Sequence, residues 1–254
     1  MSRPARVLSQ TGMYHIIFRG INRQNLFECD KDFAKMEEII AEVKAEKGFE
    51  LYAYCLMTNH VHLFIRELNS GDITKIMHKI LTKYVGWFNF KYERSGSLIG
   101  NRYKSEPIED DTYYLQLVRY IHHNPLKAGM VEKLEDYSWS SYGDYTNPTS
   151  SLTDVNFIFS MLNEDIDVAI ELFKEFHNDL SYEDFTISDG KKLTDAQLKR
   201  KAEMLLDNVK LSEIYLYPKP ERDKLLNVLR QNEFTIGQLE RLTGISRGII
   251  TRAK

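Results

Sequence analysis

The 254-residue chain has little cysteine and little proline, with two Cys and six Pro residues. Cys29 and Cys55 allow one bridge and form no C-x-x-C pair, so we expect free thiols in a reducing cytosol. No stretch approaches the ~18 consecutive apolar residues of a membrane span, and the N-terminal MSRPARVLSQ has no apolar run after its arginines. The sequence therefore predicts a cytoplasmic protein with no membrane partner.

A basic excess is also missing. The formal net charge is -3 at pH 7, which taken alone argues against a nucleic-acid partner. The distribution is more informative, because residues 150–190 carry ten acidic side chains against one basic side chain, whereas residues 191–254 carry fourteen basic against eight acidic. Residues 73–105 contain one acid, Glu93. Two basic stretches are therefore compatible with DNA binding.

Apolar residues make up 43% of the chain, enough for a core, and the first half alternates strand and helix patterns. Strand-like runs occupy residues 13–21, 49–57, 60–67 and 102–108. Helical periodicity runs from Asp30 or Asp32, either of which can cap, to Gly48, from about Asp72 to Tyr92, and from Asp110 or Asp111 to at or before Pro125. This order predicts an α+β fold, a ferredoxin-like β-α-β-β-α-β sheet with helices on one face, followed by a helix.

The turn-like segment Asn147-Pro148-Thr149-Ser150-Ser151 indicates a domain boundary. We predict a mixed domain over residues 1–147, an acidic helical linker over 148–190 and a helical DNA-binding region over 191–254. Residues 235–254, TIGQLERLTGISRGIITRAK, favour a helix-turn-helix that turns at Gly244, although Glu240 stands where a small residue usually lies. A plain helical hairpin is the alternative.

Two histidines on one strand are the sharpest local feature. His60 and His62 alternate along a strand, so both imidazoles project to one face and could share a divalent metal. Such pairs are more often merely polar surface, and a third ligand is needed. The following helix offers Tyr120, His123 and Asn124 at i, i+3 and i+4, where the Asn oxygen suits a hard cation. An ordinary amphipathic-helix tyrosine is the alternative.

Several motifs together resemble a known family. NHVHLFI, NRYKSE and YIHHNPLKAGMV, with FRGINRQNLF before them and YSWSSYGDY after them, resemble the HUH single-strand transposases of the IS200/IS605 type and most closely the REP-associated tyrosine transposases. The resemblance covers roughly residues 7–146. It implies that His60, His62 and Asn124 bind Mg²⁺ or Mn²⁺, and that Tyr120 attacks a phosphodiester to give a 5′-phosphotyrosine and a free 3′-OH.

The resemblance also implies partners. Single-stranded DNA, with a stem-loop, would be the substrate of a nucleoid-associated monomer or homodimer. Arg102 and Lys104 match the family's RYKS pattern, and we rank them first as DNA contacts. Three lysines at i+4 intervals could extend the phosphate track or form an ordinary solvated face, namely Lys75, Lys79 and Lys83. Independently of the resemblance, the helix-turn-helix pattern predicts that Arg247 and Arg252 contact duplex DNA.

Two other functions remain open from the sequence. A domesticated, non-catalytic DNA-binding regulator could keep the fold, although it would not need the complete set of His60, His62, Tyr120 and Asn124. A replication or conjugation initiator shares the His-x-His pair and the tyrosine chemistry. Such initiators usually carry a third histidine in the metal cluster, and NHVHLFI offers none nearby.

Overall fold

The structure is a computed structural model that describes residues 7–110, 112–148, 152–178, 198–199, 202–203, 205–206, 209–232, 234 and 236–252. The chain divides into two compact units, residues 1–187 and 188–254. The division falls between the boundaries that the sequence predicts at 147 and 190. No helix within the described ranges combines the length and the hydrophobicity needed to cross a bilayer.

Four antiparallel strands form the sheet of the first unit. They are β1 (Met13–Arg19), β2 (Phe49–Met57), β3 (His60–Glu67) and β4 (Lys104–Pro107), in the order β2-β3-β1-β4. This is the order of a ferredoxin-like sheet, and the predicted α+β class is confirmed. Strands β2 and β3 form a hairpin joined by Thr58 and Asn59, as their spacing predicts.

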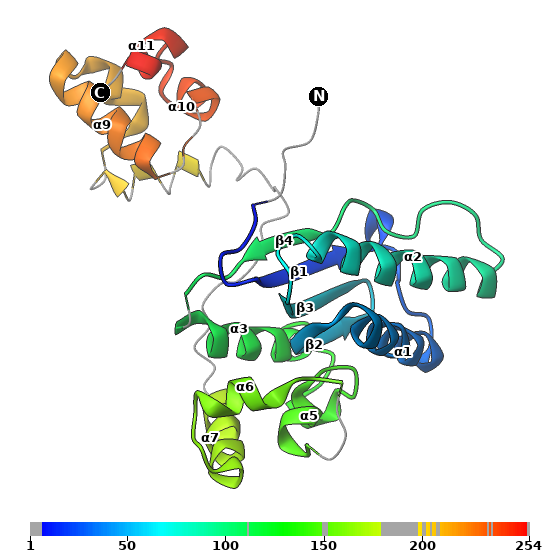
Figure 1. Ribbon diagram of the computed structural model, residues 1–254. Coiled ribbons are helices and arrows are strands. Elements are labelled where there is room, and N and C mark those ends of the chain that lie inside the picture. The colour runs from blue at the N-terminus through cyan, green and yellow to red at the C-terminus, as the bar shows by residue number, and fades with distance from the viewer. Residues whose placement is uncertain are drawn as a thin grey trace. The chain divides into compact units, whose positions relative to one another are not determined.

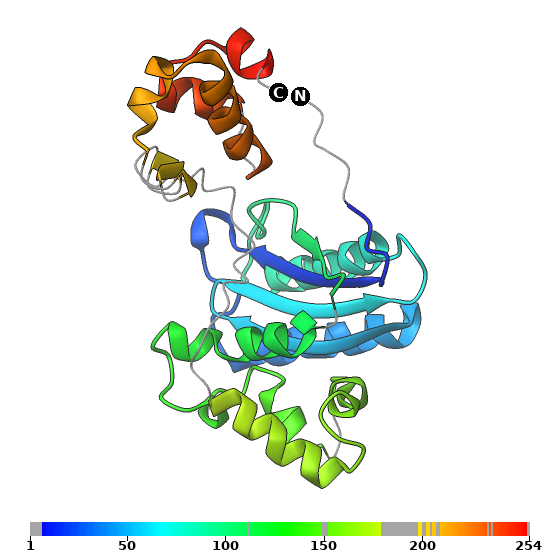
Figure 2. The ribbon, with the colours of Figure 1, turned by 90° about the vertical axis from the view of Figure 1, so that its left-hand side faces the viewer.

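Helices cover both faces of the sheet. Helices α1 (Asp30–Lys47) and α2 (Ile73–Lys91) pack on the face that carries Tyr14, Ile16 and Leu63. Helix α3 (Thr112–His122) packs on the opposite face, against Phe64. Figure 2 shows α3 in front of the sheet, with α1 and α2 behind it. Because side chains alternate along a strand, each strand supplies both cores, and only the first two helices share the single face that the sequence predicts.

Helix α1 begins differently from the prediction. Cys29, in an extended conformation, is the N-cap, and Asp32 lies at the third helical position. The Asp32 carboxylate accepts hydrogen bonds from the Glu28 and Cys29 amides at 2.7 and 3.2 Å. Asp32 therefore caps the helix from inside its first turn, in the manner of a capping-box acid, and Asp30 does not act as the N-cap.

Helix α3 ends at His122, before Pro125, as predicted. The chain then makes one more helical turn, α4 (Asn124–Lys127), in which Pro125 occupies the second position. A proline is tolerated there because the first amides of a helix have no intrahelical acceptor. This extra turn carries Asn124 and Lys127 onward from the end of α3.

Strand β2 lies at the edge of the sheet, and the chain after α4 covers it. The Leu56 amide donates to the Trp139 carbonyl at 2.9 Å, and the Tyr54 amide donates to the Ser141 hydroxyl at 2.9 Å. Unpaired strand edges invite pairing with other chains. These bonds satisfy the β2 edge from within the same chain.

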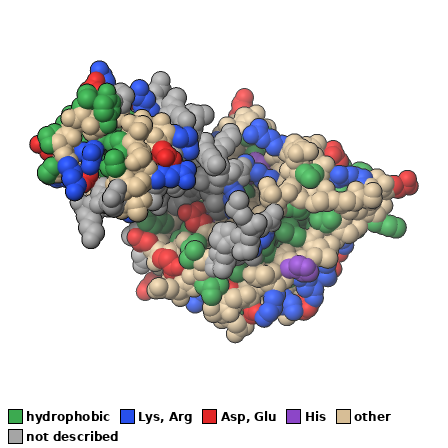
Figure 3. Space-filling model, turned by 90° about the horizontal axis from the view of Figure 1, so that it is seen from above, with side chains coloured by type: hydrophobic (Ala, Val, Ile, Leu, Met, Phe, Trp, Pro, Cys, Tyr) green, Lys and Arg blue, Asp and Glu red, His purple; other side chains and the backbone are tan. Residues whose placement is uncertain are grey.

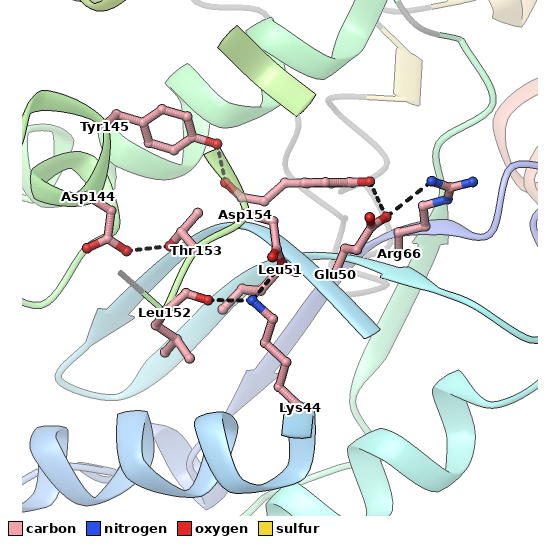
Figure 4. Close-up of polar contacts among 10 residues, drawn as sticks. Lys44, Glu50, Leu51, Arg66, Asp144, Tyr145, Leu152, Thr153 and Asp154 are labelled. Atoms are coloured by element: carbon pink, nitrogen blue, oxygen red, sulfur yellow. Dashed lines mark hydrogen bonds and ion pairs between the residues drawn. The ribbon is translucent and has the colours of Figure 1, made fainter. Parts of the chain in front are cut away.

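A second part of this cover is drawn in Figure 4. The Leu51 amide donates to the Asp154 carboxylate at 2.7 Å, and the Asp154 amide donates to the Leu51 carbonyl at 2.8 Å. Lys44 of α1 forms a 2.6 Å ion pair with the same carboxylate and donates to the Leu152 carbonyl. One segment thereby joins the sheet edge to α1.

Helices α5 (Tyr142–Thr146), α6 (Val155–Ser160) and α7 (Ile166–Asn178) lie beyond the β2 edge (Figure 1), after a short 3₁₀ turn, η2 (Leu134–Asp136). Their buried side chains Ile158, Phe159 and Phe173 belong to the same core as α3. Residues 152–178 are therefore packed against the first unit, although the sequence assigns them to a linker. The cause is that α7 is amphipathic: its acids lie outward while its apolar stripe is buried.

Histidines join α3 to α7. His122 Nδ1 lies 3.0 Å from His177 Nε2, and His122 Nε2 lies 2.6 Å from the Ser141 hydroxyl. His123 Nε2 donates to the His177 carbonyl at 2.9 Å. Burial lowers the pKa of His177 to about 3, and it lowers the pKa of His122 well below the ordinary value. Both rings are therefore neutral and serve as packing and hydrogen-bonding groups.

The second unit is helical. It contains the 3₁₀ turn η3 (Leu211–Leu216) and helices α9 (Lys219–Gln231), α10 (Ile236–Thr243) and α11 (Arg247–Arg252). Leu239, Ile245 and Ile250 are buried in its core. Gly244 joins α10 to α11 with a φ of +71°, a left-handed conformation that glycine adopts without strain. The two helices and their turn lie where the sequence predicts them, and their role in reading DNA stays a prediction.

The buried histidines make stability depend on pH. Below pH 6.5 the unfolded chain binds a proton that native His177 excludes, so the free energy of unfolding falls as the pH drops toward 3, by about 2 kcal/mol at pH 5 for this one group. His177→Gln removes that group. We expect its loss of stability between pH 7.5 and pH 5, measured by urea denaturation, to be smaller than that of the wild type. An identical loss in both proteins would contradict a neutral buried His177.

Candidate active site

The register of β3 against β1 and β2 sets the positions of the two strand histidines. His62 lies opposite Ile17 of β1 and Cys55 of β2, and it is buried, with 1% of its surface exposed. His60, two residues earlier, is half-buried on the same face. Their ring centroids are 5.1 Å apart. The two imidazoles therefore share one face of the sheet, as their spacing predicts.

Helix α3 brings Tyr120 to this face. The Tyr120 ring meets the His62 ring edge to face, with centroids 5.8 Å apart. Tyr120 is 7% exposed and belongs to the core between α3 and the sheet. Phenol and imidazoles come from the same chain, so this arrangement needs no second copy.

Asn124 lies one helical turn after Tyr120. Its side-chain nitrogen donates to the Tyr120 carbonyl at 2.9 Å and to the Ile121 carbonyl at 3.3 Å. These bonds fix the orientation of the carboxamide, and they leave the side-chain oxygen as its acceptor atom. His122 and His123, the other polar residues of this stretch, are instead buried against α7.

A third histidine, His15 of β1, lies beside the pair. Its Nε2 is 3.1 Å from Nδ1 of His62, and the two rings are stacked 5.3 Å apart. His15 is completely buried, and its Nδ1 makes no hydrogen bond with the described residues. The sequence alone does not reveal the role of His15, because nothing in it says which residues of strands 13–21 and 60–67 lie side by side.

His15 and His62 are neutral. Burial lowers the pKa of His15 to about 3. Burial also lowers the pKa of His62 well below its ordinary value, and the nearby positive charges of Arg19 and Lys127 lower it further. The Nδ1 of His60 lies 2.7 Å from the side-chain oxygen of Asn59, so this nitrogen is the donor. Neutral rings with Nδ1 engaged are suited to bind a cation through Nε2.

A metal site at His60 and His62 needs a third ligand, and the residue types nearby indicate which one it could be. Among the residues that the structure describes, no three His, Cys, Asp or Glu side chains are grouped as a metal cluster. A cation at His60 and His62 would therefore need a different third ligand. The carboxamide oxygen of Asn124, on the turn after Tyr120, is of the hard type that Mg²⁺ and Mn²⁺ prefer.

The positively charged side chain of Lys127 lies beside Tyr120. The Lys127 ammonium is 4.6 Å from the centroid of the Tyr120 ring. Lys127 is exposed on α4, seven residues after Tyr120 and on the same side of the helical path. The sequence does not single out Lys127, because the predicted helix stops at or before Pro125.

Comparisons with known proteins agree with this arrangement. The family described as "Transposase IS200 like" matches residues 9–124. A REP-associated tyrosine transposase of Haemophilus influenzae is 30% identical over 155 residues, which cover 56% of this chain and 86% of the relative. The chain belongs to the IS200-like transposase family. The resemblance inferred from the motifs is thus confirmed, and the function is a transposase-like processing of DNA by an enzyme.

A solved structure supports the fold assignment. The structure of a REP-associated tyrosine transposase bound to a REP hairpin superimposes with a TM-score of 0.50 at 20% identity, and the match covers 61% of this chain and 93% of that one. The region outside the match contributes nothing to the family assignment. At this level of identity the likeness concerns the fold alone.

Among the predicted DNA contacts of this IS200-like chain, Lys104 lies on the site's face. It is opposite Ile17 of β1, which is itself opposite His62 of β3. Two strand spacings separate the Lys104 and His62 backbones, roughly 10 Å. Arg102, just before β4, is exposed and lines an apolar groove against α2.

The three α2 lysines are not brought to the site. Lys75 forms a 2.7 Å ion pair with Asp72, Lys83 forms a 2.6 Å ion pair with Glu42 of α1, and Lys79 pairs with Glu46 of α1. Helices α1 and α2 cover the face of the sheet opposite the histidines. Lys79 and Lys83 thus join α2 to α1, and Lys75 pairs with the residue that caps its own helix. This is closer to the solvated-face alternative than to a phosphate track.

In the second unit, Arg247 begins α11, and its guanidinium donates to the Glu240 carboxylate of α10 at 2.6 Å. Glu240 therefore bonds across the turn where a small residue is usual. The side chain of Arg252 lies outside the described residues. Lysine and arginine side chains are visible at several points of the surface of this unit (Figure 3).

These positions predict different effects on DNA affinity. Lys104→Ala should weaken the binding of a fluorescent single-stranded hairpin and reduce its salt dependence, since a phosphate contact would be lost. The matched control is Lys79→Ala with Lys83→Ala, which should leave both quantities unchanged because these lysines pair with α1. Fluorescence anisotropy across a salt series measures both. A larger effect from the α2 pair than from Lys104 would reverse the assignment.

Proposed function

We propose that this transposase cuts and rejoins single-stranded DNA through a 5′-phosphotyrosine on Tyr120, in a divalent-metal-dependent reaction. The observation that carries the proposal is the placement of the Tyr120 ring 5.8 Å from His62 and, through it, beside His60, all within one chain. A tyrosine without these neighbours would be an ordinary core residue.

The residues fit a hard divalent cation. His60 and His62 would bind Mg²⁺ or Mn²⁺ through Nε2, and Asn124 would bind it through its carboxamide oxygen. The fit rests on the engaged Nδ1 atoms and on the bonds that hold the Asn124 amide nitrogen to α3. When bound, the metal supplies Lewis-acid polarisation of the scissile phosphate.

The chain's own residues do the rest of the chemistry. The Tyr120 oxygen attacks phosphorus and loses its proton, while the bond from phosphorus to the 3′ oxygen breaks and that oxygen takes up a proton. The new tyrosine ester keeps the energy of a phosphodiester, so attack by a 3′-OH reverses the step without ATP. Lys127, beside the ring, places a positive charge where negative charge develops.

His15 would act through His62. For His62 Nε2 to bind a cation, His62 Nδ1 must carry the proton and donate it to His15 Nε2. His15 then holds its own proton on Nδ1, the atom that has no partner among the described residues. Burying that group costs about 1–3 kcal/mol, a cost that a structural histidine would avoid. We therefore assign His15 as a positioning residue.

The substrate that fits best is a DNA strand with a stem-loop. This proposal draws on the similar fold of the transposase that was solved with a REP hairpin. We also propose that α10 and α11 contact duplex DNA. The left-handed turn at Gly244 and the outward Arg247, whose side chain is 71% exposed, support that role.

The nucleophile can be tested directly. Tyr120→Phe should abolish the covalent protein–oligonucleotide adduct seen on a denaturing gel with hairpin DNA and Mn²⁺, because the attacking oxygen is removed. Binding should persist, since the ring remains. Tyr113→Phe, on the same helix but with an exposed ring, is the matched control and should form the adduct normally. An adduct in the Tyr120 variant would refute the assignment.

The positioning role of His15 has its own readout. His15→Phe should weaken Mn²⁺ binding about 10- to 100-fold, the usual effect of removing a residue that hydrogen-bonds to a metal ligand and orients it. Titration followed by electron paramagnetic resonance, without DNA, measures the affinity independently of catalysis. His15→Gln keeps an acceptor and should restore part of it. If a folded Phe variant binds Mn²⁺ like the wild type, His15 does not orient His62.

A further inference from the structure

A small pocket lies next to His60. It has a volume of about 210 Å³ and is lined by Arg19, Arg23, Asn59 and His60. None of the lining residues is acidic. Two guanidinium groups and a carboxamide around one cavity are the groups that recognise a phosphate.

The backbone of this pocket is strained. Asn22 and Arg23 are consecutive non-glycine residues with φ of +51° and +63°, in the left-handed region. Asparagine tolerates this region, but the bulkier Arg23 does not adopt it readily and persists in it because the surroundings impose it. Here the strained turn, η1 (Ile21–Arg23), follows β1 directly and projects Arg23 beside His60.

Neighbouring segments impose this conformation. A Cβ on Gly20 would lie 2.1 Å from the Gln24 carbonyl oxygen, so the turn closes only with glycine at this position. The Gly20 amide donates to the Asn59 carbonyl at 2.9 Å, and the Ile21 amide donates to the Leu98 carbonyl at 2.9 Å. These contacts hold the strained turn that carries Arg23 against the β2–β3 hairpin.

Charge and connectivity tie the pocket to the site. The Arg19 charge reaches His62, whose pKa it lowers. Asn59 bonds to His60 Nδ1 through its side-chain oxygen. Arg23 is exposed, and no carboxylate of the described residues forms an ion pair with it.

We propose that this pocket binds a phosphate of the DNA strand adjacent to the scissile one, between the guanidinium groups of Arg19 and Arg23. The proposal rests on the proposed function, since His60 is shared between the pocket and the cleavage site. A strand phosphate held here fixes the distance along the backbone to Tyr120. The pocket therefore sets which phosphodiester is presented for attack.

Arg23→Asn is the decisive variant, because asparagine tolerates the left-handed conformation and removes only the charge. With a fluorescent hairpin that carries single-stranded tails, we expect roughly tenfold weaker binding and a log–log salt slope reduced by about 0.7. Arg66→Gln, at the far end of β3, is the matched control and should leave both values unchanged. Arg19→Gln should behave like Arg23→Asn.

Replacing single charged phosphates of the DNA by neutral groups locates the phosphate that the pocket binds. Single methylphosphonates are placed in turn along the tail, and at one position Arg23→Asn should cause no further loss of binding. The pocket does not hold a phosphate if Arg23→Asn weakens binding equally at every methylphosphonate position. The same conclusion follows if Arg23→Asn changes DNA binding no more than Arg66→Gln does. Adduct formation is scored separately: wild type that binds through Arg23 but forms no adduct would refute the proposed cleavage while the pocket stands.

Discussion

Ile17 lies opposite His62 in the antiparallel pair of β1 and β3, and the geometry of the site depends on that register. It places His15, His60 and His62 on the face toward α3, while Tyr14, Ile16 and Leu63 fill the core under α1 and α2. A shift by one residue would bury the imidazoles among those apolar side chains and turn the core residues toward Tyr120. The many buried apolar residues on the α1–α2 face therefore enforce the orientation of the few histidines on the other.

The sequence predicts those parts of the site that depend on local periodicity. The His-x-His alternation, the turn between β2 and β3 and the one-turn spacing of Tyr120 and Asn124 need only strand and helix geometry. His15 could not be found this way, because its contact with His62, 47 residues later in the sequence, exists only through the pairing of two strands. The sequence leaves Lys79 and Lys83 open between a phosphate track and a solvated face for the same reason: their partners Glu46 and Glu42 lie on a different helix, α1.

Charge patterning misleads at the domain boundary too. Residues 150–190 are strongly acidic, and a linker is the natural interpretation of such a stretch. Phe173 and Ile158 nevertheless lie in the core that holds α3. A sum of charges cannot reveal an apolar stripe, whereas the 3.6-residue period of α7 does. Helices α6 and α7 thus support the tyrosine-bearing helix from its outer side, through neutral histidines that bond to each other and to backbone carbonyls.

The electrostatics of the site complete the argument about partners. The chain carries a net charge of -3, yet its histidine face combines neutral imidazoles with the cations of Arg19, Lys104 and Lys127. Most carboxylates lie elsewhere, for example on α1 and α7, where they pair with lysines or face solvent. Glu106 of β4, opposite His15, is an acid on the histidine face itself. A DNA strand approaching this face meets positive charge within a Debye length, about 8–10 Å, while the distant acids are screened. Net charge therefore says little about whether such a protein binds DNA, because the segregation of charge within one fold determines the local potential that a phosphate experiences.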